Sequence, residues 1–304
     1  MRKKLAGALF AAGAAGAGIY ALLKQRSQPV QDHPFLAGEK PLAMAHRGGK
    51  GLWPSNTLYA FEQATAMGVD VLEMDIHSTS DGVLVVRHDP SVDATTNGSG
   101  VIRHMTLEQI KSLDAGYTWT ADGGQSYPYR SRGITIPTLE EVLLAFPGMR
   151  LNIDIKPDDP AVVTQFCRIL RTYHKLDQVM VGSFYDQQLY RFRELCPEAA
   201  TAAGVAETRQ FVYLNLAFLG AVFQPRAQAF QIPEYGGGLR LVTKRFVHAA
   251  HAHNMEVHVW TVDEEKDMQR LLDWGVDGIF TDYPDRLMRV LGRLTPAADH
   301  PTNH

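Results

Sequence analysis

The chain has 304 residues, of which 45% are hydrophobic and 21% charged, with a formal net charge of −3 at pH 7. This composition is ordinary for a globular protein and excludes a largely disordered chain. The slightly negative charge and the lack of a basic stripe with interleaved aromatic residues exclude a nucleic-acid-binding protein. The length allows one large domain or two small ones.

The first residues form a segment of different character. A basic start, Arg2 to Lys4, precedes an uncharged run over residues 5–23, which is about long enough to span a bilayer. Positive charge before the run predicts that residues 1–24 anchor the chain in a membrane with its catalytic domain on the extracytoplasmic side, periplasmic in a bacterium. A cleaved signal peptide and a secreted protein are the alternative, because Ala15-Gly16-Ala17 resembles a cleavage site.

Residues 25–40 are predicted to be a linker, residues 41–294 one catalytic domain, and residues 295–304 a disordered tail. Within the domain, strand and helix patterns alternate. The predicted strands that follow one another in β/α order are 42–45, the strand beginning near 69, 150–156, 179–182, 200–204, 227–232, 257–261 and 278–281. Eight strands in about 250 residues are typical of an α/β protein of the TIM (β/α)8 barrel class. A doubly wound open sheet is the alternative, but no Gly-rich dinucleotide loop supports it.

The stretch from Val69 to Pro90 carries the central motif. Glu73 and Asp75 lie two residues apart on a strand, so their side chains share one face. Asp81-Gly82 predicts a two-residue turn, which makes the second strand the first arm of a protruding β-hairpin. A turn centred there places Asp75 opposite His88. Carboxylates beside an imidazole suggest a metal site with phosphoryl chemistry.

Active-site residues of a TIM barrel lie at the carboxyl ends of its strands, and polar residues gather there in this sequence. Glu73, Asp75 and Asp154 are three carboxylates that one barrel mouth would bring together. Buried like charges repel unless a cation neutralises them, so these residues are predicted to hold one divalent cation, Mg²⁺ or Ca²⁺. Salt-bridged or helix-capping surface carboxylates are the alternative.

Five further side chains lie at the same strand ends. His46 and His88 are predicted to form an acid–base pair, since histidine titrates near neutral pH. The planar guanidinium of Arg47 suits a phosphodiester oxygen, and Lys156 is placed to reach a phosphate oxygen or else has a structural role. Trp260, at the end of the seventh strand, is a candidate substrate-binding residue.

Many ordered motifs match one known family. They are His46-Arg47-Gly48-Gly49, Asn56-Thr57, Glu73-x-Asp75, Asp81-Gly82, His88-Asp89, Ile136-Pro137-Thr138-Leu139, Asp154-x-Lys156, Trp260-Thr261, Gly275 to Gly278 and Thr281-Asp282. From residue 42 to about 293, the chain resembles the glycerophosphodiester phosphodiesterase family, within the phosphatidylinositol-phospholipase-C-like superfamily. The resemblance implies a TIM barrel that uses a divalent cation to hydrolyse glycerophosphodiesters to glycerol 3-phosphate and an alcohol.

By resemblance, Glu73, Asp75 and Asp154 fall on the metal ligands, the two histidines on the acid–base pair, and Arg47 and Lys156 on phosphate-contacting positions. The nucleophile is either water or the substrate's own glycerol hydroxyl. Two positions depart from the family pattern. Ser55 stands where the family usually has Glu, and Asp154 stands where it often has Glu, so the choice of metal remains open between Mg²⁺ and Ca²⁺.

The apolar run over residues 211–223 bears on the substrate. It is either an ordinary barrel helix or a membrane-facing lid, within 205–225, that admits an acyl chain. The second interpretation raises a lysophospholipase D activity on lysophospholipids at a membrane. A barrel that binds phosphodiesters without turnover is a third possibility, and both histidines argue against it.

The chain contains two cysteines, Cys167 and Cys196. They are too few for a zinc cluster or a disulfide framework. Because Cys is among the most buried residue types, two free buried thiols are predicted, with one disulfide as the alternative.

Overall fold

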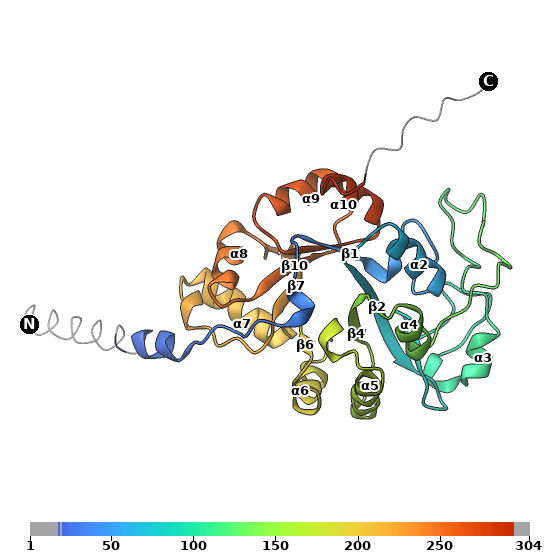
Figure 1. Ribbon diagram of the computed structural model, residues 1–304, viewed down its shortest axis with the longest axis horizontal. Coiled ribbons are helices and arrows are strands. Elements are labelled where there is room, and N and C mark those ends of the chain that lie inside the picture. The colour runs from blue at the N-terminus through green and yellow to red at the C-terminus, as the bar shows by residue number, and fades with distance from the viewer. Residues whose placement is uncertain (1–17, 19, 295–304) are drawn as a thin grey trace, which may run out of the picture.

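The computed structural model describes residue 18 and residues 20–294 (Figure 1). Eight parallel strands run in the order β6-β5-β4-β2-β1-β11-β10-β7, and a parallel bridge from Ala202 to Ala229 brings β6 beside β7. The strands therefore form a nearly closed barrel, which confirms the predicted TIM architecture. Their bounds are β1 Leu42–Ala45, β2 Val71–Ser78, β4 Arg150–Ile155, β5 Val179–Gly182, β6 Ala200–Thr201, β7 Ala229–Pro233, β10 Glu256–Trp260 and β11 Gly278–Thr281.

Helices surround the strands on the outside of the barrel (Figure 1). Several begin at a threonine cap; Thr138, for example, forms a capping box with Glu141. The α-helices are α2 Leu58–Ala66, α3 Leu107–Lys111, α4 Leu139–Ala145, α5 Pro160–Thr172, α6 Asp186–Leu195, α7 Val205–Leu216, α8 Lys244–His251, α9 Glu265–Leu272 and α10 Pro284–Val290. Short 3-10 helices are η1 Pro34–Leu36, η2 His46–Gly48, η3 Ile102–His104, η4 Leu176–Gln178 and η5 Gly220–Val222, and a small two-stranded ribbon joins β8 Tyr235–Gly236 to β9 Leu239–Arg240.

The segment before β1 lies against the barrel. The Val30 amide donates to the His253 carbonyl at 3.0 Å, and Asn254 Nδ2 donates back to the Val30 carbonyl at 2.8 Å. Phe35 in η1 is 0% exposed and belongs to the apolar cluster inside the barrel, which includes Leu42 and Phe280. The apolar ring of Phe35 thus completes the interior, although the sequence around it reads as a linker.

The second strand pairs antiparallel with β3 Leu84–Val86, in a register one residue away from the predicted one. Ile76 lies opposite Val86, and the Arg87 amide donates to the Asp75 carbonyl at 2.8 Å. Asp75 therefore lies opposite Arg87 and not His88. The cause is a three-residue loop, 80–82, in which Gly82 alone has a positive φ, whereas the predicted two-residue turn needs two such residues.

The apolar run over 211–223 forms the end of α7 and η5 in the helical layer. Phe211 stacks on Phe230 at 4.6 Å between ring centroids and meets Phe223 and Phe246 edge-on. These rings are buried in the core between barrel and helices. The interpretation as an ordinary barrel helix therefore accounts for the buried part of the run, while Phe218 is 78% exposed.

The prediction of a membrane-anchored protein is contradicted. Within residues 18 and 20–294, no helix combines the length and apolar character needed to cross a bilayer. The helical residues 20–26 span only about 10 Å, against about 30 Å of hydrocarbon core. Residues 1–17 and 19, on which most of the predicted anchor or signal peptide falls, lie outside the described residues, as does the predicted tail, 295–304.

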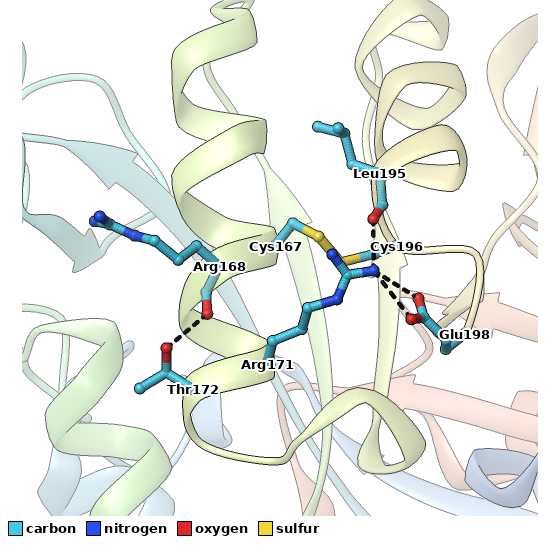
Figure 2. Close-up of a disulfide and its surroundings, with 7 residues drawn as sticks. All are labelled: Cys167, Arg168, Arg171, Thr172, Leu195, Cys196 and Glu198. Atoms are coloured by element: carbon cyan, nitrogen blue, oxygen red, sulfur yellow. Dashed lines mark hydrogen bonds and ion pairs between the residues drawn. A yellow bond between two sulfur atoms is a disulfide. The ribbon is translucent and has the colours of Figure 1, made fainter.

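The prediction of free thiols is also wrong, because Cys167 and Cys196 form a disulfide with their Cα atoms 6.0 Å apart (Figure 2). The bond joins the middle of α5 to Cys196, the residue that follows α6. Beside it, Arg171 donates to the Leu195 carbonyl and forms an ion pair with Glu198. Two adjacent barrel helices are therefore linked covalently, on the outside of the barrel.

We expect this disulfide to stabilise the fold without affecting the active site. Its partners are 29 residues apart in sequence, and closing a loop of this size lowers the entropy of the unfolded chain by the equivalent of about 3–4 kcal/mol. The double variant C167A/C196A should therefore melt roughly 10 °C lower in a thermal scan. Reductant should lower the melting temperature of the wild type and leave that of the variant unchanged; an unchanged wild type would contradict the prediction.

Candidate active site

The residues expected from the sequence lie at the carboxyl ends of neighbouring barrel strands. The parallel pairing of β2 with β4 places Asp75 beside Asp154, and β1 lies between β2 and β11. Lys156 follows β4 directly, and His88 follows β3. The structure therefore gathers the predicted set at one mouth of the barrel: His46, Arg47, Glu73, Asp75, His88, Asp154, Lys156 and Trp260.

The imidazole of His46 is held by a carboxylate that follows the last strand. His46 Nδ1 lies 2.6 Å from Asp282 Oδ1, and Lys50 Nζ lies 3.1 Å from the other oxygen of Asp282. Burial works against ionisation of Asp282, but the hydrogen bonds and charges of His46 and Lys50 together outweigh it and lower the pKa of the carboxyl. An ionised Asp282 fixes the imidazole with Nδ1–H toward the carboxylate, which leaves Nε2 facing the site, 4.0 Å from Glu73 Oε2.

The turn after β1 positions the backbone and side chain of Arg47. Arg47 has φ 53°, its amide donates to Glu73 Oε2 at 2.7 Å, and its Nε lies 3.5 Å from Asp75 Oδ2. Gly48 allows η2 to press on α2, because a Cβ there would lie 2.9 Å from the Ala60 side chain. Asn56 supports the turn by donating its amide to the Arg47 carbonyl and its Nδ2 to Asp75. The local backbone thus aims donors at both carboxylates of β2.

Lys156 neutralises the carboxylates of two strands. Its Nζ lies 2.9 Å from Asp75 Oδ1 and 2.6 Å from Asp154 Oδ2. Burial would raise the pKa of Asp75, but the charges of Lys156 and Arg47 outweigh burial and lower it. For Asp154, burial prevails and raises the pKa. Burial, and then the charge of Asp75, raise the pKa of Glu73 to about 7. The site therefore carries an excess of negative charge that its own cations only partly relieve.

His88 also has a carboxylate partner. Its Nδ1 lies 2.7 Å from Asp89 Oδ1, and its carbonyl oxygen contacts His77 Nε2 at 3.0 Å. Burial lowers the pKa of the His88 imidazole in spite of Asp89, so His88 is neutral near pH 7. The two predicted catalytic histidines therefore have the same arrangement: a carboxylate binds Nδ1, and Nε2 is left to exchange protons with a substrate.

An aromatic pair flanks the ammonium group of Lys156. Phe184 follows β5, is 60% exposed and meets Trp260 edge-on at 6.1 Å between ring centroids. Lys156 Nζ lies 5.5 Å from the centre of the Phe184 ring. Trp260 thus contacts the charged residues through Phe184, a residue to which no role was assigned from the sequence.

The donor set has the chemistry of a hard-cation site, but its arrangement differs from a preformed one. Carboxylate oxygens are the ligands that Mg²⁺ and Ca²⁺ prefer, and burial, followed by the charge of Asp75, raises the pKa values of Glu73 and Asp154. Across the described part of the chain, however, no three His, Cys, Asp or Glu side chains converge as a metal would require. Lys156 occupies the position between Asp75 and Asp154.

Comparison with known proteins identifies the family. The model of the glycerophosphoryl diester phosphodiesterase family matches residues 46–286. The chain belongs to this family. It is 34% identical to a glycerophosphodiester phosphodiesterase from Bacillus subtilis, over 84% of this chain and 88% of that protein. Family membership confirms the expected class of enzyme, a phosphoric diester hydrolase.

Two further relatives carry names that state a product or an activity. The structure of an Oleispira antarctica phosphodiesterase, solved in complex with the product sn-glycerol-3-phosphate, superposes with a TM-score of 0.69 at 27% identity, over 83% of this chain and 97% of that one. Human lysophospholipase D GDPD1 is 27% identical over 82% of this chain and 85% of that protein. This phosphodiesterase chain is thus similar to proteins named for two related activities.

The sequence did not assign a role to Asp282 or Asn56, although both stand in the family motifs. The signal for Asp282 is topological. β1 pairs with β11 so that Ala45 lies opposite Thr281, and the residues that follow these two strands are His46 and Asp282. A barrel that closes in this order places the two side by side. Asn56 has no comparable signal, because its contact with Asp75 depends on the path of a loop.

Replacing Asp282 tests the role of the carboxylate. D282N removes the acceptor that holds His46 Nδ1–H, and the amide can select the wrong tautomer, so we expect kcat to fall about 10²–10⁴-fold with little change in KM. The matched control is K50Q, which removes the other ion pair of Asp282 and leaves the bond to His46. Steady-state kinetics measure both, and similar losses in the two variants would contradict a role through His46.

The raised pKa of Glu73 predicts that the stability of the metal-free protein depends on pH. The folded chain keeps the Glu73 proton up to about pH 7, whereas the unfolded chain loses it near pH 4.5. This contribution to stability is therefore present at low pH and is lost as the pH rises from 4.5 through 7. In EDTA, the unfolding free energy of E73Q minus that of the wild type should rise by on the order of 2 kcal/mol between pH 5 and pH 8. A difference that stays constant with pH would contradict it.

Proposed function

We propose that this chain hydrolyses glycerophosphodiesters to glycerol 3-phosphate and an alcohol by His/His acid–base catalysis that depends on one divalent cation. The observation that carries the proposal is the pair of histidines at one barrel mouth, each with Nδ1 bound to a carboxylate. The name of the Bacillus subtilis relative and the product bound to the Oleispira antarctica enzyme support the glycerol-bearing substrate.

The residues divide the work as follows. Arg47 and Lys156 bind the phosphate oxygens, and Lys156 exchanges part of its contact with the carboxylates for the phosphate. His88, neutral near pH 7, accepts a proton from the attacking oxygen, and His46 donates a proton to the leaving alkoxide. Asp282 and Asp89 hold the imidazoles and stabilise their charged forms. Each histidine thus changes its protonation state once per bond made or broken.

Glu73, Asp75 and Asp154 would hold the cation, either Mg²⁺ or Ca²⁺. When bound, it would neutralise the charge that grows on the phosphate oxygens. Asp154 is shorter by one methylene than the Glu often found there, and Ser55 replaces a family Glu, so the set has fewer or shorter carboxylates than the family pattern. We expect a weaker cation affinity as a result.

Cleavage of lysophospholipids is the second candidate. The exposed ring of Phe184 beside Trp260 gives the site an apolar edge on which an acyl chain can lie, and the human relative is named a lysophospholipase D. In this reaction the same groups would release a lysophosphatidic acid in place of glycerol 3-phosphate.

The test compares glycerophosphocholine with lysophosphatidylcholine in Mg²⁺, Ca²⁺ or EDTA. Choline leaves in both reactions, so the phosphate-bearing product is identified by mass spectrometry. We expect release of glycerol 3-phosphate that EDTA abolishes, and a loss of about 10²–10⁴-fold in H46A and in H88A. Preference for lysophosphatidylcholine would favour the second candidate.

Two controls make this result interpretable. Each histidine variant is compared with the wild type by circular dichroism and thermal melting, so that misfolding is separated from lost chemistry. Full activity of a correctly folded H46A or H88A would remove that residue from the mechanism, and no turnover with any metal would overturn the proposal.

A further inference from the structure

An exposed apolar surface begins where α7 ends. Tyr213 and Leu216 lie three residues apart on one face of the helix and are 61% and 51% exposed. Leu216 lines a small groove together with Leu239 of β9 and Arg245 of α8, so the surface continues from α7 to α8 (Figure 1). The exposed side chains that form this α7 patch are Tyr213, Leu216, Phe218, Leu219 and Leu239. Single exposed apolar residues are ordinary, but an adjoining group of them indicates a binding surface.

The backbone takes an unfavourable conformation to place Phe218 in this patch. The Phe218 amide donates to the Asn215 carbonyl at 3.2 Å, and the Leu219 amide donates to the Leu214 carbonyl at 2.7 Å. These two bonds form the Schellman turn that ends many helices, and Phe218, with φ 60°, occupies its left-handed position. Glycine is usual there, because a Cβ makes the conformation costly. A mostly exposed aromatic ring at this position adds little to the core, so its presence indicates a function outside folding.

Cations accompany the patch, and acidic residues are nearly absent from this part of the chain. Residues 208–255 contain five Lys or Arg and a single acidic residue, Glu234, although the whole chain has a net charge of −3. Glu234 is engaged by Arg270 at 2.7 Å. Lys244 and Arg245 are exposed in the first turn of α8, and the Arg245 guanidinium lies 4.4 Å from the centre of the Phe218 ring. The patch is therefore apolar at its centre and positively charged at its edge.

We propose that the α7 patch binds a lipid surface that contains anionic headgroups. Exposed aromatic and leucine side chains beside lysine and arginine are typical of elements that lie in the membrane interface. The apolar side chains enter the headgroup region, and Lys244 and Arg245 contact the lipid phosphates. This contact is peripheral and needs no segment that crosses the bilayer. A second copy of the chain is a poorer occupant, because a symmetric contact would bring the same cations together.

The test measures how the full-length chain partitions onto vesicles of phosphatidylcholine with and without phosphatidylglycerol, by co-sedimentation. We expect partition onto the vesicles with phosphatidylglycerol, weakened by added salt. F218G removes the ring and should lower the partition coefficient about tenfold or more. K244Q/R245Q should lower it by roughly tenfold, because each cation near an anionic surface contributes to binding. The matched control is L144A, which shortens a 65% exposed leucine of α4 and should change nothing.

The variant F218G also separates lipid binding from folding. Glycine suits the left-handed position, so F218G should melt at the wild-type temperature or above it. A clearly lower melting temperature would assign the ring a packing role and overturn the proposal. The proposal does not depend on the proposed function, and turnover of glycerophosphocholine measured in parallel should be equal in all these proteins, since none of the changes touches the barrel mouth.

A label at the patch shows which part of the chain meets the lipid. Both cysteines of the sequence form the disulfide, so F218C and L144C each offer a single thiol for an environment-sensitive fluorophore. The emission of the label at position 218 should shift to shorter wavelength on vesicles with phosphatidylglycerol, and that at position 144 should not. This comparison distinguishes the α7 patch from binding by residues 1–17.

Several outcomes would overturn the proposal. They are no partition of the wild type, equal partition onto both kinds of vesicle, wild-type partition of F218G, and an unshifted label at position 218. Self-association of the wild type in sedimentation velocity that F218G abolishes would also overturn it, because the patch would then be an interface between two copies of the chain.

Discussion

The active-site end of the barrel depends on the neutralisation of carboxylates buried on two adjacent strands. The pairing of β2 with β4 fixes Asp75 beside Asp154, and both would be costly to bury as unpaired anions. Lys156, the residue after β4, and Arg47, in the turn after β1, supply the positive charges that these carboxylates require. Arg47 has a left-handed conformation, and in this conformation its backbone amide donates to Glu73 Oε2. Electrostatics on β2 thus shape the loop that carries His46.

The barrel and most site residues could be predicted because both depend on local patterns. Alternating strand and helix periods identify β/α units, and parallel strands place their last residues at one edge, which is where His46, Glu73 and Lys156 lie. The contact of His46 with Asp282 joins residues 236 apart in sequence. It depends on how the barrel closes, which no local period records.

The predictions that failed did so for local and for tertiary reasons. The predicted hairpin register was wrong by one residue. Thr79 Oγ donates to Asp81, and the Thr79 amide donates to the Val83 carbonyl, so the loop is longer than the Asp81-Gly82 pair indicates. The disulfide depends on how closely α5 and α6 pack, since Cys167 and Cys196 meet only when those helices lie side by side. Phe35 stands in a polar stretch and is buried because it packs against the apolar cluster inside the barrel.

The interior of the barrel changes in polarity along its axis. Phe35, Leu42 and their neighbours form an apolar layer, and above them lies a layer of hydrogen-bonding side chains that ends in Gln231. Buried amide and imidazole groups destabilise a core unless every one is paired. Here the chain of bonds continues from His258 through Glu256 to Lys40, whose ammonium group is partly exposed at the other rim. The hydrogen-bonded network therefore extends from buried side chains inside the barrel to a charged group that is in contact with solvent.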